Sequence, residues 1–163
     1  MTLLAIDGPA GAGKTTLAAQ FEAEFSQHST VKTIHMDDLY NGWDHALTLV
    51  LTDLLSRIAQ AHLSQDEFVI DKFNWTMMSF DVKERILPTD ILILEGVGSA
   101  QHVIRATGAA TYWLDISPEI GLQRVLNRDG AHLEAQMRKW QIQQDVHFLK
   151  DQTRENCNFN LSS

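Results

Sequence analysis

Residues 8–16 have the types and the spacing of a loop that binds phosphate. The pattern Gly-x-x-x-x-Gly-Lys-Thr turns successive backbone N–H groups toward a phosphate, at the positive end of the helix that follows. In such a loop the Lys14 ammonium reaches the β- and γ-phosphate oxygens, and the Thr15 hydroxyl is offered to Mg²⁺. An ordinary glycine-rich turn is the alternative, which the apolar run before the loop and the helix pattern after it disfavour. The expected nucleotide-binding residues are Gly8, Ala10, Gly11, Ala12, Gly13, Lys14, Thr15 and Thr16.

Two carboxylates, Asp37 and Asp38, follow the apolar segment at residues 31–36. Open α/β sheets bind their ligands at the carboxyl ends of the strands, so we expect this acidic pair to face the same crevice as the phosphate loop. Asp37 could there take the proton of a substrate hydroxyl whose oxygen attacks the γ-phosphate. The alternative is a solvated acidic turn that caps the next helix.

A third carboxylate, Glu95, ends the apolar run at residues 91–94. In enzymes that use nucleoside triphosphates, an acid at the end of such a strand usually holds Mg²⁺, often through water. We therefore expect Glu95 and Thr15 to share a metal ion. A carboxylate that only caps a loop would give the same pattern.

Arg124 and Arg128 are four residues apart near the end of an expected helix. Side chains with this spacing lie on one face, so the two guanidinium groups could clamp a transferring phosphate from a small lid around residues 124–133. The alternative is that both are cations at a helix C-terminus, which the helix dipole favours.

Short apolar runs alternate along the chain with segments of helical period, an order that predicts an α/β fold with parallel strands and crossover helices. Helices are expected at about residues 14–26, 45–63 and 133–154, and Ser117 followed by Pro118 has the pattern of an N-cap and the first residue of another helix. No linker or repeat is present, so residues 1–163 are predicted to form a single domain. Strands are expected at residues 3–6, 31–36, 68–70, 91–94, 111–114 and, with a weaker pattern, 158–161.

Composition is that of a small intracellular enzyme. A chain of 163 residues can bury a sufficient core as one domain, and its single cysteine, Cys157, cannot form an internal disulfide, which predicts a reduced, cytoplasmic setting. No basic leader or long apolar run is present, so neither a signal peptide nor a membrane span is expected. The net charge of −8 argues against nucleic-acid binding, which needs a basic face.

Histidine and tryptophan residues give little indication of a site. The 7 histidines show no metal-binding spacing, so each is expected to be a surface or hydrogen-bonded residue. Trp140 is expected to pack the last long helix onto the sheet. Trp75 could stack on a substrate ring, but aromatic residues beside a strand belong to the core at least as often.

These segments together resemble the uridine kinase family of P-loop kinases, a group that includes phosphoribulokinase-like and pantothenate kinase-like enzymes. The resemblance implies a P-loop three-layer sandwich, with a five-stranded parallel sheet in the order 2-3-1-4-5 and helices on both faces. It also implies that Asp37 is the base that binds the hydroxyl and that Tyr40 lies on the substrate side. It covers most of the chain and depends on residues 8–16, Asp37-Asp38-Leu39-Tyr40, Glu95-Gly96 and Arg124 with Arg128-Asp129, in this order.

The sequence differs from that of the family in the segment that binds the nucleoside. Uridine kinases usually carry Tyr-Asp-Phe and then a His-Ser-Arg group there, whereas residues 71–79 place Asn74 at the aspartate position and contain no later histidine or arginine. This difference argues against uridine itself as the acceptor. The expected substrate-binding residues are Asp37, Asp38, Tyr40, Asn74 and Trp75.

The leading hypothesis is a Mg²⁺-dependent kinase that transfers the γ-phosphoryl group of ATP to a hydroxyl of a nucleoside or a similar sugar-bearing metabolite. Its expected catalytic residues are Asp37, Lys14, Arg124 and Arg128. The rival hypothesis is an ATPase or an ATP-binding regulator without a small-molecule acceptor. It needs no acid aimed at a hydroxyl, so Asp37 beside Tyr40 favours the kinase. The expected partner is thus a small molecule, with no nucleic acid and no membrane, and a homo-oligomer is left open.

Overall fold

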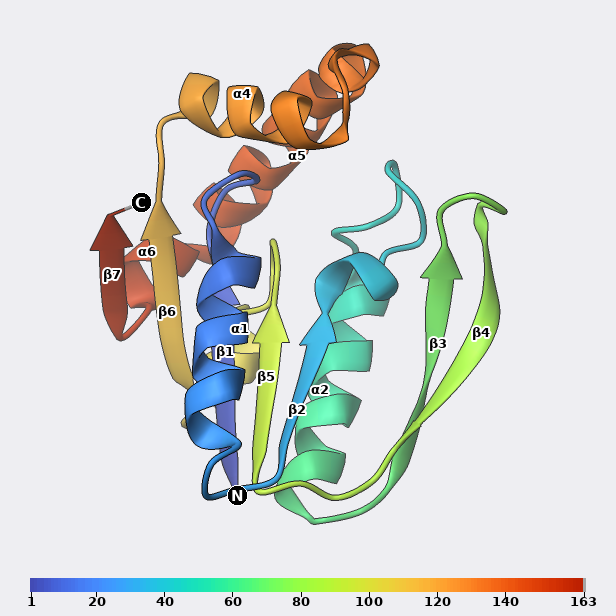
Figure 1. The fold of residues 1–163 in the computed structure, drawn as a ribbon, viewed down its shortest axis with the longest axis vertical. Helices are drawn as coiled ribbons and strands as arrows, with labels where there is room; N and C mark the ends of the chain where they lie inside the picture. Colours follow the sequence, from blue (N-terminus) through green and yellow to red (C-terminus); the bar gives the residue numbers. More distant parts are fainter. Residues whose placement is uncertain (163) are drawn as a thin grey trace.

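The computed structural model describes residues 1–162, in which five parallel strands form the central sheet (Figure 1). Ser163, the last residue of the predicted domain, lies outside the described residues. The strands are β1 Thr2–Asp7, β2 Val31–His35, β5 Ile91–Glu95, β6 Ala110–Asp115 and β7 Phe159–Ser162. Their order across the sheet is β2-β5-β1-β6-β7, with every neighbouring pair parallel. The expected α/β fold is therefore confirmed.

One strand expected from the sequence, at residues 68–70, is not part of this sheet. It belongs to β3 (Phe68–Asn74), which pairs antiparallel with β4 (Ser79–Ile86) in a hairpin beside the sheet (Figure 1). The strand order therefore differs from 2-3-1-4-5 when every strand of the chain is numbered, and it equals that order only when β3 and β4 are left out of the count. The sequence pattern missed β4 because most of its side chains are exposed, so no apolar run marks it.

Helices cover both faces of the sheet, which gives the expected three layers (Figure 1). Successive residues of a strand point to opposite faces. Leu4 and Ile6 of β1 accordingly pack against the first helix, whereas Leu3 and Ala5 belong to a larger core on the other face. The helices are α1 Lys14–Phe25, α2 Leu49–Leu63, α3 His102–Arg105, α4 Pro118–Asp129, α5 Glu134–Asp151 and α6 Thr153–Asn156.

The boundaries of two expected helices are corrected by the structure. α2 begins at Leu49 rather than near residue 45, because the chain before it forms a loop in which Asn41 and His45 make an isolated antiparallel bridge. The last expected helix is interrupted at Gln152, where a left-handed φ of 51° separates α5 from α6. The Ser117 N-cap is confirmed, since its hydroxyl oxygen accepts a hydrogen bond of 3.4 Å from the Ile120 N–H.

The parallel strands all end at the same edge of the sheet, and α4 lies across that edge (Figure 1). The loops that follow β1, β2 and β5 therefore meet below α4. This is the place where open α/β sheets bind their ligands. Throughout residues 1–162, no helix combines the length and the apolar composition needed to cross a bilayer.

Candidate active site

The loop between β1 and α1 forms an open cradle of backbone N–H groups. Gly11 and Gly13 have φ angles of 82° and 92°, which favour glycine, and their N–H groups have no hydrogen-bond partner within residues 1–162. A Cβ atom at Gly13 would meet no atom within 4 Å, so the space beside the loop is open. The first N–H groups of α1 also lack helical partners, and the helix dipole adds positive potential there. An anion such as phosphate fits this cradle.

Two contacts from helices far along the chain hold the loop in place. The backbone of Gly121 in α4 lies against that of Gly11, so a Cβ atom at Gly121 would come within 2.5 Å of the Ala10 carbonyl oxygen. From α5, the buried Gln144 side chain accepts a hydrogen bond of 3.0 Å from the Ala10 N–H. Sequence reasoning missed both residues, because a single glycine or glutamine inside a helix gives no spacing signal.

Asp7, the last residue of β1, ties the phosphate loop to the loop after β5. Its buried carboxylate accepts hydrogen bonds from the N–H groups of Gly8 at 2.7 Å, Gly98 at 2.9 Å and Ala100 at 2.9 Å. Burial raises the pKa of this carboxyl group, although the backbone donors and Lys14 act in the opposite direction. Asp7 was also missed, and its only signal was an acidic residue directly after a strand expected to be buried.

Lys14, the first residue of α1, has its side chain folded back over the loop. Its Nζ donates to the carbonyl oxygens of Gly8 and Pro9, both at 2.8 Å. Burial lowers the pKa of the ammonium group, and the carboxylates of Asp7 and Glu95 oppose this shift. The ammonium group lines the same cavity as the open N–H groups of the loop.

Thr15, Glu95 and His35 meet where α1 begins and where β5 and β2 end. The Thr15 hydroxyl lies 3.2 and 3.3 Å from the two carboxylate oxygens of Glu95, and His35 Nδ1 lies 2.5 Å from Glu95 Oε1. The register explains this meeting, because His35 is paired with Glu95 across β2 and β5. The hydrogen bond to Glu95 raises the pKa of the His35 imidazole. His35 could not be singled out from its residue type and spacing, since its place beside Glu95 depends on strand register.

The donors at this place fit a hard divalent cation. A carboxylate and a hydroxyl are oxygen ligands of the kind that Mg²⁺ takes, and Mg²⁺ usually completes its shell with phosphate oxygens and water. In the part of the chain that the structure describes, no group of three or more His, Cys, Asp or Glu side chains is arranged to hold a metal ion unaided. Thr15 and Glu95 would therefore hold Mg²⁺ together with a bound nucleotide.

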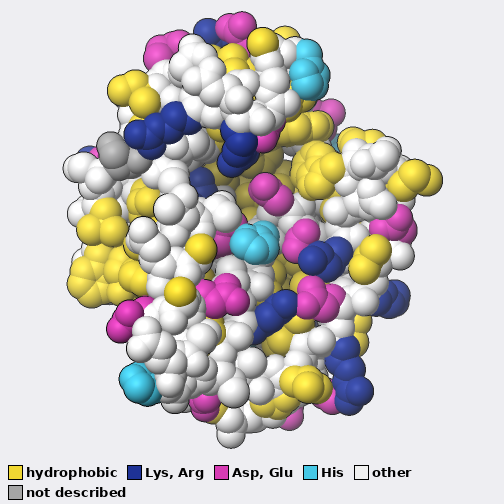
Figure 2. Space-filling view, in the orientation of Figure 1, with side chains coloured by type: hydrophobic (Ala, Val, Ile, Leu, Met, Phe, Trp, Pro, Cys, Tyr) yellow, Lys and Arg dark blue, Asp and Glu magenta, His cyan; other side chains and the backbone are white. Residues whose placement is uncertain are grey.

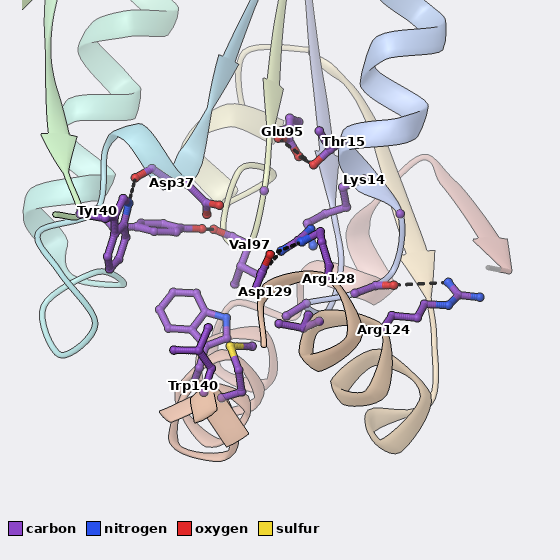
Figure 3. A pocket seen from close by; sticks show the side chains of 18 of the residues that line it. Lys14, Thr15, Asp37, Tyr40, Glu95, Val97, Arg124, Arg128, Asp129 and Trp140 are labelled. Atoms are coloured by element: carbon purple, nitrogen blue, oxygen red, sulfur yellow. Dashed lines mark hydrogen bonds and ion pairs between the residues drawn. The ribbon is translucent and has the colours of Figure 1, made fainter. Parts of the chain in front are cut away.

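Asp37 lies across a single cavity from Lys14. The cavity has a volume of about 520 Å³ and is hollowed below α4, with hydrophobic side chains deep inside and charged side chains of both signs around it (Figure 2). The Asp37 carboxylate is open to this cavity, yet the surrounding protein desolvates it and, with the charge of Glu95, raises its pKa. Figure 3 shows Asp37 between Tyr40 on one side and Lys14 on the other.

Aromatic side chains form the side of the cavity opposite the phosphate loop (Figure 3). Tyr40 donates its hydroxyl to the Val97 carbonyl oxygen at 2.6 Å, and its ring centroid lies 5.3 Å from that of Trp140. Trp43 packs edge-on between two other indoles, 5.9 Å from Trp140 and 5.1 Å from Trp75. The Trp75 indole N–H donates to the Asp37 carbonyl oxygen at 3.0 Å. Trp140 thus packs α5 onto the core, as expected, and lines the cavity as well.

Both expected lid arginines line the cavity from α4. Arg124 donates to the Gly11 carbonyl oxygen at 3.3 Å, so it touches the phosphate loop directly. Arg128 makes a two-pronged contact with the neighbouring Asp129, at 2.7 and 2.6 Å. The structure therefore brings both guanidinium groups to the phosphate side of the cavity.

Four expected site residues do not line the cavity. The Asp38 carboxylate pairs with Lys72 at 2.9 Å. The Asn74 side chain instead stabilises the turn of the β3–β4 hairpin: its amide nitrogen donates to Asp81 at 2.8 Å, and its oxygen accepts from two backbone N–H groups of the turn. Gly8 and Ala12 belong to the phosphate loop without facing the cavity.

A scan of the sequence against protein-family models finds no match, and a search of the curated proteins finds none either. Solved structures do match. One, described as a possible uridine kinase from Bacillus stearothermophilus, has a TM-score of 0.66 and 20% sequence identity, covering 98% of this chain and 88% of that chain.

Two further matches extend the comparison. A structure from Silicibacter sp. TM1040, described with reservation as a fructose transport system kinase, has a TM-score of 0.67 and 17% identity, covering 98% of this chain and 88% of that one. Shikimate kinase from Bacteroides thetaiotaomicron has a TM-score of 0.55 and 14% identity, with coverage of 99% and 85%. The resemblance to uridine kinase-like P-loop kinases is thereby confirmed for the fold.

Proposed function

We propose that this protein is a Mg²⁺- and ATP-dependent kinase that transfers the γ-phosphoryl group to a hydroxyl of a small molecule, a nucleoside or a related sugar-bearing metabolite. The observation that carries this proposal is the place of Asp37, whose carboxylate opens onto the same cavity as Lys14 and the phosphate loop. A protein that only hydrolyses or senses ATP needs no carboxylate there. The solved structures described above support the proposal, because each is a kinase by its description.

In the proposed reaction the acceptor hydroxyl oxygen bonds to the γ-phosphorus, in line with the bond that breaks between that phosphorus and the bridging oxygen of the departing ADP. The hydroxyl proton passes to the Asp37 carboxylate. Its raised pKa suits this role, because a carboxylate whose pKa lies nearer to neutrality is a stronger base than an ordinary aspartate.

The phosphate loop and Lys14 bind and neutralise the triphosphate in this scheme. The N–H groups of Gly11 and Gly13 have no competing partner within residues 1–162, so they can donate to phosphate oxygens without breaking a bond in the protein. Lys14 exchanges two carbonyl oxygens for phosphate oxygens. Mg²⁺, held by Thr15 and Glu95, would neutralise charge on the phosphates and orient them.

We extend the proposal to a small lid at residues 124–133. Within residues 1–162, Arg128 makes its side-chain hydrogen bonds to the exposed Asp129, and it can exchange this partner for two oxygens of a phosphate, which accept from a guanidinium group in the same bidentate way. Arg124 already bridges α4 to the phosphate loop. In this scheme the two guanidinium groups stabilise the charge on the transferring phosphate and exclude water.

The substitution Asp37→Asn tests the proposal. It keeps the size of the side chain but removes the proton acceptor, so transfer to an acceptor hydroxyl should fall roughly 10²- to 10⁴-fold, with little change in ATP affinity. The measurement is ADP formation with and without a panel of hydroxyl-bearing metabolites, in Mg²⁺ and in EDTA. Asp38→Asn is the matched control, because the Asp38 carboxylate pairs with Lys72 outside the cavity. ADP formation that ignores every acceptor would instead support the ATPase or regulator.

The raised pKa of Asp37 predicts opposite effects of pH on activity and on stability. Activity needs the ionised carboxylate, so kcat/KM should fall as the pH drops through this pKa, and Asp37→Asn should lack that limb of the profile. Protonation of Asp37 stabilises the folded state. This stabilisation is complete below the pKa of 3.8 in the unfolded chain and is lost as the pH rises through the pKa in the folded protein. Asp37→Asn should therefore slightly raise the Tm at neutral pH.

A further inference from the structure

We propose that the protein has a second binding site, separate from the candidate active site, for a small molecule in which a carboxylate or phosphate group is joined to an apolar body. The site is a cavity of about 650 Å³ between the start of α2, the start of α3 and one face of α5. Of residues 1–162, none lines both this cavity and the candidate active site. The proposal does not depend on the kinase function, because none of its observations involves the phosphate loop or Asp37.

Two polar side chains that line this second cavity have nitrogen atoms without a hydrogen-bond partner. Gln101 is only 3% exposed; its Oε1 accepts from the Thr52 hydroxyl at 2.6 Å, whereas its amide nitrogen donates to no group within residues 1–162. His147 Nε2 is fully enclosed and also lacks a partner in this part of the chain. The two nitrogens lie near one point, since a Cβ atom on Gly98 would be 3.5 Å from the first and 3.4 Å from the second. An unpaired buried polar nitrogen is costly, and a ligand oxygen that reaches this point would relieve the cost.

The start of α2 adds donors and a positive potential to the same cavity. Thr48 and Leu49 line it, and Thr48, at the N-cap, makes no side-chain hydrogen bond to the helix. The N–H groups of the first helical turn have no helical acceptor, and no acidic residue lies in that turn. The helix dipole favours an anion at this end. The helix terminus and the Gln101 amide therefore favour the same kind of ligand group, one with negatively charged oxygen atoms.

The charged side chains around the second cavity are compatible with an anion. Lys150 lines the cavity and makes no ion pair within residues 1–162. The Asp151 carboxylate is already neutralised, because it accepts from Arg105 at 2.6 Å and from the Thr153 hydroxyl at 2.7 Å. Asp44, the other acid of the lining, is exposed, so water and salt screen its charge. Lys150 matches this one unpaired carboxylate, and the dipole of α2 makes the balance positive.

Apolar side chains around the same cavity suit the body of the ligand. Leu49, Ile142 and Val146 line the cavity and are 80%, 66% and 61% exposed, and Leu47 lines it as well. Ile142 and Val146 are one turn apart on α5, so their side chains are neighbours. A bare inorganic anion would leave these side chains in water, whereas an apolar body would cover them. The volume of the cavity lies within the range of about 300–1,000 Å³ that small-molecule sites have.

The first experiment titrates the intact ¹⁵N-labelled protein with four probes and follows its amide resonances, in the presence of Mg²⁺ and a non-hydrolysable ATP analogue that occupies the candidate active site. The probes are phenyl phosphate, benzoate, the uncharged benzyl alcohol and inorganic phosphate. We expect the better of the first two to bind at least about tenfold more tightly than the last two, with shifts at Leu49 and Gln101. The comparison of phenyl phosphate with benzoate shows which anionic group the site prefers. Equal binding of benzyl alcohol or of inorganic phosphate, or no binding of either aromatic anion, would overturn the proposal.

The second experiment uses Leu49→Glu, which places a carboxylate in the first turn of α2, where it repels the ligand and competes for the N–H groups. The Kd of the preferred anion should rise at least about tenfold, whereas the Tm should stay equal or increase, because an acid at this end of a helix is favourable. Leu87→Glu is the matched control, since Leu87 is an exposed leucine that lines neither cavity. Unchanged affinity in Leu49→Glu, or an equal loss in Leu87→Glu, would overturn the proposal. Loss of binding in Lys14→Ala would place the anion at the phosphate loop and would overturn it as well.

The third experiment uses His147→Phe, which keeps an aromatic ring and removes the unpaired nitrogen. The Kd of the preferred anion should rise about fivefold without a fall in Tm, because neither ring nitrogen of His147 has a hydrogen-bond partner to lose within residues 1–162. A lower Tm with unchanged affinity would show that His147 only packs the fold, and would remove it from the site.

Discussion

The two sides of the cavity are built in different ways. The phosphate side is built mainly from one continuous stretch, residues 8–16, and much of it is backbone, to which α4 adds Arg124 and Arg128. The aromatic side is assembled from separate places in the chain: Tyr40 and Trp43 follow β2, Trp75 lies in the hairpin beyond β3, and Trp140 lies in α5. The phosphate loop can therefore be recognised from residue spacing along the sequence, whereas the aromatic side forms only when the chain folds.

This difference has a functional meaning. Phosphate is the same ligand in every nucleotide enzyme, so a fixed loop of N–H groups can bind it wherever a strand leads into a helix. Recognition of one acceptor needs a specific set of side chains, and side chains that come from several elements can vary without disturbing the phosphate loop. Substitutions on the two sides should accordingly separate the kinetic constants for ATP from those for the acceptor.

The largest effect is expected for Lys14→Ala, on the phosphate side. Loss of the positioned ammonium group should lower kcat by about 10²-fold or more, because the charge that grows on the transferring phosphate loses a donor. The folded state should persist, with an unchanged circular dichroism spectrum. Lys72→Ala is the control, since Lys72 pairs with Asp38 outside the cavity. Equal kcat values for the two variants would show that the lysine of the loop does not take part.

A smaller effect is expected for Gly121→Ala, which tests how the phosphate loop is supported. The added Cβ would lie 2.5 Å from the Ala10 carbonyl oxygen, so either α4 or the loop must shift. Nucleotide affinity should fall about tenfold and the free energy of unfolding by about 1–3 kcal/mol, as for overpacking elsewhere. Isothermal titration and urea unfolding measure both. The neighbouring exposed Ile120→Ala should change neither, and a wild-type nucleotide affinity in Gly121→Ala would contradict the supporting role.

Tyr40→Phe tests the aromatic side by removing one buried hydroxyl. The Val97 carbonyl oxygen then loses its donor, which should lower the free energy of unfolding by about 1 kcal/mol and the Tm by about 2–4 °C. Nucleotide affinity should not change, because Tyr40 belongs to the other side. Tyr112→Phe is the control, since the Tyr112 hydroxyl has no hydrogen bond in the described part of the chain. A drop in nucleotide affinity would show that the two sides are coupled.

The smallest effect is expected for Asn74→Ala. Its side chain bonds to Asp81 and to the turn of the hairpin, so its loss should cost less than about 1 kcal/mol and leave the KM for the acceptor unchanged. Thermal unfolding and steady-state kinetics check the two statements. A several-fold rise in the acceptor KM would restore the substrate-binding role that the sequence alone favours.

The sequence predicted what depends on local pattern. The parallel strands, the helices on both faces and the Ser117 cap follow from apolar periodicity and from residues that act on their own neighbours. Asp7 and Gln144 could not be identified, because each acts on the phosphate loop through a contact that only the folded chain makes. The place of Trp140 beside the cavity could not be predicted either. An aromatic residue on the inner face of a helix follows the same helical periodicity whether it contacts the core or a cavity.

The close contact between Gly121 and Gly11 determines how α4 can move. A helix whose first turn is wedged against the phosphate loop cannot slide along it, so the contact acts as a fulcrum. Arg124 and Arg128 lie three and seven residues beyond it, at roughly 4.5 and 10.5 Å along the axis for a rise of about 1.5 Å per residue. Any tilt of α4 about this point carries the Arg128 backbone roughly twice as far as that of Arg124. In such a tilt Arg124 therefore stays closer to the phosphate loop, and Arg128 covers the larger distance.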